Sequence, residues 1–135
     1  MDTRPIYCCQ CGKPQNCEIR KGSDIYPNRP DLARKWFYQC PKCHQWIGCH
    51  PGTKNPLGVI PTQEMKKARM IIHDLIDPLW KKGIISRGKL YRLISKELHI
   101  EHYHTGWTRS LRECRDVYRA ATKIINRLRE NGNGL

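Results

Sequence analysis

Two Cys-x-x-Cys pairs, Cys8 with Cys11 and Cys40 with Cys43, are the strongest chemical signal in the chain. A two-residue spacer lets two thiolates converge on one ion while amides of the turn donate to the sulfurs, and two such pairs complete a tetrahedral site. The 28 residues between the pairs exceed the usual spacing of roughly 15 to 20, but loop-closure entropy grows slowly with length. We therefore predict a closed, structural four-cysteine Zn²⁺ site, with buried thiols that hold no metal as the alternative.

The other four cysteines fit packing better than ligation. Cys9 and Cys17 are compatible with a swapped ligand or a second metal, but small buried residues that happen to be thiols are the simpler interpretation. Cys49 and His50 are adjacent, so their side chains point to opposite faces of an extended segment and are awkward joint ligands. Cys114 falls within an apolar helical stripe, which indicates core packing.

A few histidines raise the question of catalysis. His50, His73 and His104, together with Asp77, could in principle bind the metal of a nuclease. The chain lacks a His-Glu-x-x-His motif, the combination of His-x-Glu with Pro-Cys-x-x-Cys, and a P-loop. A closed four-thiolate site also leaves no coordination position open for hydrolysis. We therefore expect histidines that satisfy backbone groups or touch phosphate and no enzyme activity, with a metal-dependent nuclease as the less favoured alternative.

The charge balance favours a polyanionic partner. The chain has 25 Lys and Arg against 12 Asp and Glu, a net charge of +13. DNA or RNA is the simplest such partner, although an anionic membrane surface or an acidic protein would also fit. The first residues contain no signal-peptide core, and no apolar run reaches the roughly 18 residues of a membrane span. We expect a cytoplasmic protein without a membrane partner. In a reducing cytoplasm, eight cysteines favour metal over disulfides.

Composition divides the chain near Gly58. Residues 1–58, rich in Cys, Pro and turn residues, predict a zinc-ribbon module whose aromatic segment 35–40 is a strand leading into the second cysteine pair. Residues 59–130 predict a helical module, and residues 131–135 a disordered tail. The predicted fold class is small α+β: a four-cysteine zinc ribbon of short antiparallel strands, packed on or followed by a three-helix unit.

The first predicted helix opens at Pro61 or Thr62. Pro78 should end or kink it, and Gly83 should stop it. Spacings of three and four residues give the helix one apolar face. That face consists of Ala68, Ile71, Ile72, Leu75 and Leu79.

The next two helices are predicted from caps at Ser86 and Thr108. The second helix should bury Leu90, Leu93, Ile94 and Leu98, and expose Lys89, Arg92 and Lys96. The third has the most regular pattern in the chain. Its predicted buried stripe is Leu111, Cys114, Tyr118, Ala121, Ile125 and Leu128.

Basic residues on the third helix and after the second cysteine pair are the candidate nucleic-acid contacts. On the helix they recur every three or four residues, so they share an exposed face that could follow a phosphate backbone or be merely solvated. The helical candidates are Arg112, Arg115, Arg119, Lys123 and Arg127. The candidates near the cysteines are Lys42, His50, Thr53 and Lys54. Trp36, Trp46 or Trp107 could stack on bases if the target is single-stranded.

Several segments together resemble a family of small bacteriophage and prophage proteins named for containing a zinc finger. They are "YCCQCG", "WFYQCPKCHQWIGCHPGTKNPLG", "HDLIDPLWKKGIISRGKLYRLISKEL", and "HTGW" followed by "CRDV", and they cover residues 7–117. The resemblance implies a phage origin and a zinc fold, with Cys8, Cys11, Cys40 and Cys43 as metal ligands. The chain departs from the family at Cys9, where the family usually has proline. Other matching positions are Cys49, His50, Gly52, Thr53, Pro56, Leu57, Gly58, His73, Asp77, Trp80, His104 and Gly106.

These observations favour a phage-encoded zinc-ribbon protein that binds DNA or RNA in the host bacterial cytoplasm, mainly through backbone phosphates. A second hypothesis is an interaction protein that docks on a host enzyme or nucleoprotein complex and modulates or inhibits it. The same basic surface would then meet an acidic face of the partner.

Overall fold

The computed structural model describes residues 2–132 and confirms the predicted small α+β class. The chain divides into two compact units, residues 1–63 and 64–135, whereas composition placed the division near Gly58. We call the described parts of these units the sheet unit and the helical unit. Of the tail predicted at 131–135, residues 133–135 lie outside the described residues.

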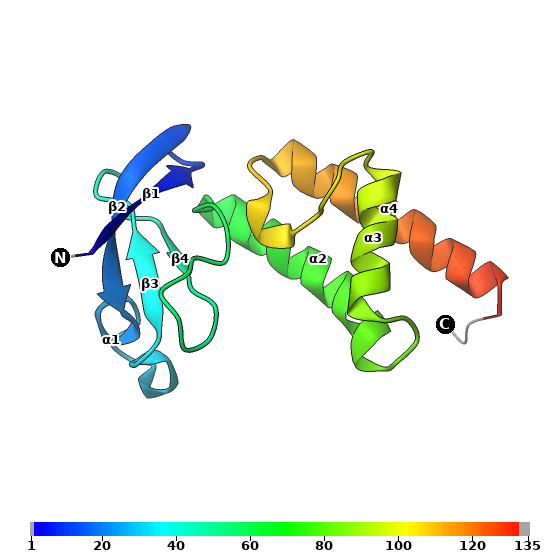
Figure 1. Cartoon of the computed structure of the whole chain (residues 1–135), viewed down its shortest axis with the longest axis horizontal. Coiled ribbons are helices and arrows are strands. Elements are labelled where there is room, and N and C mark those ends of the chain that lie inside the picture. The colour runs from blue at the N-terminus through cyan, green and yellow to red at the C-terminus, as the bar shows by residue number, and fades with distance from the viewer. Residues whose placement is uncertain (1, 133–135) are drawn as a thin grey trace. The chain divides into compact units, whose positions relative to one another are not determined.

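The sheet unit is a four-stranded antiparallel sheet (Figure 1). Its strands follow chain order, and each pairs with the next. They are β1 (Thr3–Cys8), β2 (Lys13–Lys21), β3 (Trp36–Gln39) and β4 (Trp46–Gly48). Because β1 and β3 run in the same direction, their last residues lie at the same end of the sheet. Cys8 ends β1 and Cys40 follows β3, so this topology brings the two cysteine pairs together.

The connection from β2 to β3 contains a short helix and a 3₁₀ turn, α1 (Gly22–Ile25) and η1 (Pro30–Leu32). Gly22 is buried where these two segments meet. A Cβ atom at this position would lie 1.6 Å from the backbone oxygen of Leu32. Any other residue would therefore force the two segments apart.

After β4 the chain returns to the edge of β1. The Ile60 N–H donates to the Tyr7 oxygen and the Cys9 N–H to the Ile60 oxygen, each over 2.9 Å. Ile60 is completely buried and covers the strand end that carries the first cysteine pair. The core of the sheet unit is Ile6, Cys8, Cys17, Tyr38, Cys40 and Ile60.

The helical unit contains three long helices, as the sequence predicted (Figure 1). They are α2 (Gln63–Lys81), α3 (Arg87–Glu97) and α4 (Leu111–Glu130), and the 3₁₀ turn η2 (Thr105–Trp107) precedes the last. Their buried side chains form one core of their own. It consists of Ile72, Ile76, Leu79, Ile85, Leu90, Tyr91, Ile94, Tyr103, Cys114, Val117, Ala121, Ile124 and Ile125. Among the described residues, none of the helices is long and apolar enough to cross a membrane.

The first of these helices does not end at Pro78, and its buried face differs from the predicted one. Pro78 lies inside α2, which continues to Lys81 before Gly83 ends it with a φ of +74°. Proline lacks the backbone donor and crowds the carbonyl four residues before it, here that of Asp74, yet the helix continues for three more residues. The buried face also includes Met65 and Arg69, whereas Ile71, predicted to be buried, is 55% exposed.

The cap of α3 is confirmed, because the Ser86 hydroxyl accepts a hydrogen bond from the Lys89 N–H over 3.2 Å. The cap of α4 is Ser110 and not Thr108. The Ser110 hydroxyl accepts from the Glu113 N–H over 3.1 Å, and the Glu113 carboxylate accepts from the Arg109 N–H. This arrangement resembles a capping box, except that the carboxylate accepts from the N–H of Arg109, the residue before the cap, and not from that of Ser110.

The buried stripe of α4 is rotated from the predicted one. Leu111 and Tyr118 are 37% and 43% exposed. The helix instead buries Cys114, Val117, Ala120, Ala121, Ile124 and Ile125. Spacings of three and four fit two overlapping stripes that share several positions, and only packing against the other helices selects between them.

Candidate metal centre

The thiols of Cys8, Cys11, Cys40 and Cys43 form a compact cluster. Their sulfur atoms all lie within 4.8 Å of one another. The Cys8 and Cys43 sulfurs are 3.4 Å apart, and those of Cys11 and Cys40 are 3.8 Å apart. Zn–S bonds of about 2.3 Å arranged as a tetrahedron place neighbouring sulfurs roughly 3.8 Å apart. The cluster therefore has the size and donor set of a structural Zn²⁺ site.

Each cysteine pair is held by a backbone turn of the same kind. The Gly12 N–H donates to the Cys8 oxygen over 2.8 Å, and the His44 N–H donates to the Cys40 oxygen over 3.0 Å. Gly12 has a φ of +71° and His44 a φ of +65°. The residue after each pair thus adopts the left-handed conformation, which glycine accepts readily and histidine accepts at some cost.

The acidity of the thiols shows why this cluster suits a cation. Burial raises the pKa of Cys8 and also that of Cys43. Burial acts in the same direction on Cys40, but the backbone amides of Cys43 and Lys42 outweigh it and lower the pKa of Cys40. When Zn²⁺ binds, it replaces the thiol protons, and the zinc–thiolate bonds compensate for the desolvation of the sulfurs.

Two of the remaining thiols pack in the sheet unit. Cys17 is fully buried, and its thiol donates to the Gln15 oxygen over 3.4 Å. Burial raises the pKa of Cys17 to about 12, so it is a neutral thiol at physiological pH. Cys49 packs against the same core, and burial raises its pKa as well. Within residues 2–63, neither belongs to the four-thiol cluster.

Comparison with known proteins agrees with this geometry. A family model described as a zinc-finger-containing domain matches residues 4–124. The chain belongs to this zinc-finger-containing family. No curated protein and no solved structure shows a significant match. Together, the family and the four-thiol cluster identify a zinc-binding protein whose zinc finger lies in the sheet unit.

The loop that follows the zinc finger is folded on itself. The His50 N–H donates to the Asn55 oxygen over 2.9 Å, and the Thr53 hydroxyl donates to the His50 oxygen over 2.8 Å. The same hydroxyl accepts from the Asn55 N–H over 3.1 Å. Thr53, a predicted nucleic-acid contact, therefore uses its hydroxyl to shape the loop, while His50 is exposed at the start of the loop.

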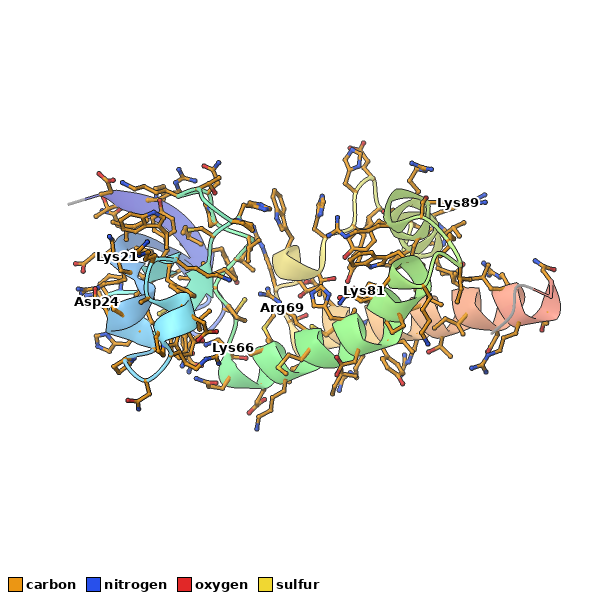
Figure 2. The ribbon with its side chains drawn as sticks, turned by 90° about the horizontal axis from the view of Figure 1, so that it is seen from below. Lys21, Asp24, Lys66, Arg69, Lys81 and Lys89 are labelled. Carbon is orange, nitrogen blue, oxygen red and sulfur yellow. The ribbon has the colours of Figure 1, made fainter. Side chains whose placement is uncertain are left out.

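The lysines near the zinc finger differ in their surroundings. Lys42 lies exposed within the second cysteine pair. The Lys54 ammonium lies 4.7 Å from the Trp36 ring centroid and 3.2 Å from an Asp2 carboxylate oxygen. Lys21, labelled in Figure 2, also lies over Trp36, at 5.0 Å. Exposed contacts of this kind contribute little to stability, so these ammonium groups remain accessible to an anion.

The predicted cations of α4 are all exposed. Two of them bind Glu97: Lys123 at 3.6 Å and Arg127 at 3.1 Å. Within residues 64–132, the others have no ion pair within 4.0 Å; they are Arg112, Arg115 and Arg119. These cations lie on the side of α4 opposite its buried stripe, as their spacing predicts.

The histidines of the helical unit have local partners. The Nδ1 of His73 is 3.3 Å from the Asp77 Oδ1, and the Trp80 indole donates to the same oxygen over 3.2 Å. The His104 ring neighbours the Trp107 ring, with centroids 6.1 Å apart. Within residues 64–132, these side chains form no cluster of three or more metal ligands. His50 belongs to the sheet unit.

Sequence reasoning overlooked a buried arginine. Arg69 is 7% exposed, and its guanidinium donates to the Thr108 hydroxyl over 3.1 Å and to the Thr108 oxygen over 2.6 Å. Figure 2 labels Arg69 on α2. The sequence feature that indicates its burial is its position in the apolar pattern, four residues after Met65 and three before Ile72. A charge at such a position indicates a buried hydrogen-bonded group.

Proposed function

We propose that this zinc-binding protein binds nucleic acid, mainly through backbone phosphates contacted by α4. The exposed cationic face of α4 is the observation that supports this proposal. Arg112, Arg115 and Arg119 carry three charges on successive turns without an ion pair inside the helical unit. A protein of net charge +13 that leaves such a row uncompensated is suited to a polyanion.

The length of this face suits several phosphates. Arg112 and Arg127 are separated by about 22 Å at 1.5 Å per residue. That distance corresponds to roughly six base-pair steps of 3.4 Å. Lys123 and Arg127 form ion pairs with Glu97. We therefore assign the larger contribution to phosphate binding to the three arginines nearer the N-terminus of α4.

The sheet unit adds a smaller contribution in this proposal. Lys42 and His50 are exposed, and Lys54 and Lys21 lie over Trp36. We infer that the zinc finger orders this part of the surface and takes no part in chemistry. The resemblance of the chain to phage proteins supports a phage origin, and we infer from the cationic surface that the protein acts on nucleic acid in its host.

The salt dependence of binding tests the proposal. We expect the full chain, loaded with zinc, to bind oligonucleotides with a log affinity that falls linearly with log salt, with a slope of about 0.9 per contacted phosphate for duplex DNA and about 0.7 for single strands. Replacing Arg112, Arg115 and Arg119 by alanine should reduce the slope on duplex DNA by about 3.

A charge-matched variant provides the control. Arg34, Lys35 and Lys13 are exposed in the sheet unit, and replacing them by alanine removes the same number of charges. This control should keep most of the slope. Absence of salt-dependent binding to any DNA or RNA would overturn the proposal. If both triple variants lose the same amount of slope, α4 is not the surface that contacts the phosphates.

An apolar groove between α2 and α4 supports a second candidate function, docking on a protein. The groove encloses about 280 Å³, and three of its apolar side chains are exposed: Ile71, Leu111 and Tyr118. Arg115 lies on its rim. Apolar side chains beside a cation fit an amphipathic helix with acidic flanks. Binding of such a synthetic helix should weaken in Tyr118→Ala and survive nuclease treatment, and failure to bind would exclude this candidate.

A further inference from the structure

Two hollows meet in the segment that connects α3 to α4. One encloses about 350 Å³ and the other about 220 Å³. His102, Tyr103 and His104 line both of them. The two hollows therefore share one short stretch of the chain as lining.

Aromatic rings and a cation follow one another along these hollows. Trp107 is 66% exposed, and its ring centroid lies 6.1 Å from that of His104. The His104 ring lies 6.3 Å from the Tyr91 ring, over which the Arg87 guanidinium sits at 4.5 Å. Tyr91 is buried, so Trp107 and His104 are the rings of this row that a base can reach, and exposed rings near a cation resemble the surfaces on which unpaired bases stack.

The two hollows differ in chemistry. The larger has an apolar wall of Leu98, Ile100 and Val117 and reaches the carboxylates of Glu113 and Asp116. An apolar wall accepts the face of a base, and carboxylates accept hydrogen bonds from its exocyclic amino groups. Phosphate would be repelled there, because it carries the same charge as the carboxylates.

The smaller hollow has the opposite preference. Arg87 and Arg92 line it with His102 and His104, and their two positive charges outnumber the one carboxylate there, that of Glu101. The Arg87 guanidinium donates to the Tyr91 hydroxyl over 3.4 Å, which leaves most of its five N–H groups for another acceptor. Two guanidinium groups that line one hollow suit a phosphate, which each of them can bind in bidentate fashion.

The connecting segment is held in place by buried hydrogen bonds. The Tyr103 N–H donates to the Ser95 hydroxyl over 2.9 Å, and that hydroxyl donates to the Tyr91 oxygen over 2.7 Å. At the other end of the segment, Arg69 binds Thr108. A segment fixed at both ends loses little conformational entropy when a ligand binds.

We propose that these hollows form a binding site for one nucleotide of a single-stranded nucleic acid. Its base stacks on Trp107 in the larger hollow, and its phosphate binds Arg87 and Arg92 in the smaller. This inference rests on the proposed nucleic-acid function and adds strand preference to it. A base inside a duplex is stacked on both faces and cannot reach Trp107, so the site selects unpaired strands.

Binding of matched oligonucleotides to the zinc-loaded full chain tests the site. We expect Trp107→Ala to weaken binding of single-stranded oligo(dA), and of the RNA of the same sequence, by about 5-fold to 150-fold. Trp107→Phe should retain most of the affinity. An oligonucleotide of the same length with abasic positions keeps the phosphates but lacks bases, so Trp107→Ala should not change its binding.

Three controls make the test specific. Tyr118→Ala removes another exposed aromatic ring of the helical unit and should leave single-strand binding unchanged. Arg87→Ala with Arg92→Ala should weaken binding of both the intact and the abasic strand more than Lys89→Ala with Lys96→Ala, a charge-matched pair on the same helix.

The outcomes separate this inference from the proposed function. Equal affinity of Trp107→Ala and the unmodified protein for intact strands, with the salt slope and the α4 effect preserved, would overturn the nucleotide site and leave the proposed function standing. Loss of all salt-dependent binding in the unmodified protein would overturn both.

Discussion

At the residue scale, burial and backbone position assign different roles to cysteines that look alike in the sequence. Cys8, Cys17 and Cys40 are all completely buried, yet only the first and third belong to the four-thiol cluster. Cys17 lies in the middle of β2 and donates to a backbone oxygen, so its thiol acts as a small apolar side chain. Ligation therefore follows from placement at the hairpin ends.

This distinction predicts that two cysteine substitutions differ in their effect on zinc binding. Cys40→Ser should abolish binding of one zinc per chain, because the site loses a thiolate, whereas Cys17→Ala should keep the zinc and cost about 1 kcal/mol from a small cavity. Metal analysis of the purified variants measures the zinc content. Loss of zinc in Cys17→Ala would contradict the assignment of the ligands.

The left-handed residues after the cysteine pairs give a second prediction. His44 has a φ of +65° where the first pair has Gly12. His44→Gly should stabilise the zinc-loaded protein by about 0.5 kcal/mol, since the strain removed slightly exceeds the added chain entropy. Gly12→Ala should destabilise it. Thermal unfolding in excess zinc measures both, and a lower midpoint for His44→Gly would show that its side chain has a further role.

At the element scale, the connection between α3 and α4 is hydrogen-bonded to the helices on which it packs. Arg69 reaches it from α2 and Ser95 from α3. Tyr103 and Thr105 are buried within it, and their hydroxyl groups are hydrogen-bonded to each other. Burial and this hydrogen bond together explain why the segment presents His104 and Trp107 in fixed positions.

Removing the buried guanidinium should loosen this connection. Arg69→Met deletes two hydrogen bonds to Thr108 and should destabilise the helical unit by about 3 kcal/mol. Hydrogen exchange at the amides of residues 103–108 should accelerate most. Lys67→Met, an exposed position on the same helix, should change stability by less than about 0.5 kcal/mol. Unchanged exchange in Arg69→Met would show that the segment is held by other contacts.

At the scale of the whole molecule, the two units depend on different sources of stability. The sheet unit has a small core, half of which consists of cysteines, and such a core requires a metal or disulfides to remain folded. The helical unit has a larger aliphatic and aromatic core, and residues 64–132 contain no cluster of three or more metal-ligating side chains. Zinc therefore stabilises one unit directly, while the other is stabilised by apolar burial.

Zinc removal should accordingly unfold the chain in part. We expect a chelator to remove the amide signals of residues 2–63 while the helical circular dichroism of residues 64–132 is largely retained. Acid should have the same effect, because protons compete with zinc for thiolates. Zinc holds the thiolates unprotonated in the folded state, so this stabilisation is present at neutral and higher pH and decreases as pH falls.

Zinc release followed with a chromogenic chelator across a pH series measures this dependence. A helical signal lost together with zinc would contradict the separation of the two sources of stability. A sheet unit that keeps its amide signals after zinc removal would show that its core suffices without metal.

The sequence by itself determined the zinc site and the succession of a cysteine-rich module with strands and a unit of three helices. Paired cysteines are local, since a two-residue spacer limits how two thiols can converge, and Ser86 marks a helix start through contacts within one turn. Only the tertiary structure decided which face of α4 is buried and that Arg69 holds Thr108. The physical reason is that a three-and-four spacing leaves the helix free to rotate by part of a turn until other elements pack against it, and the hydrogen-bond partner of a buried charge can lie far along the chain.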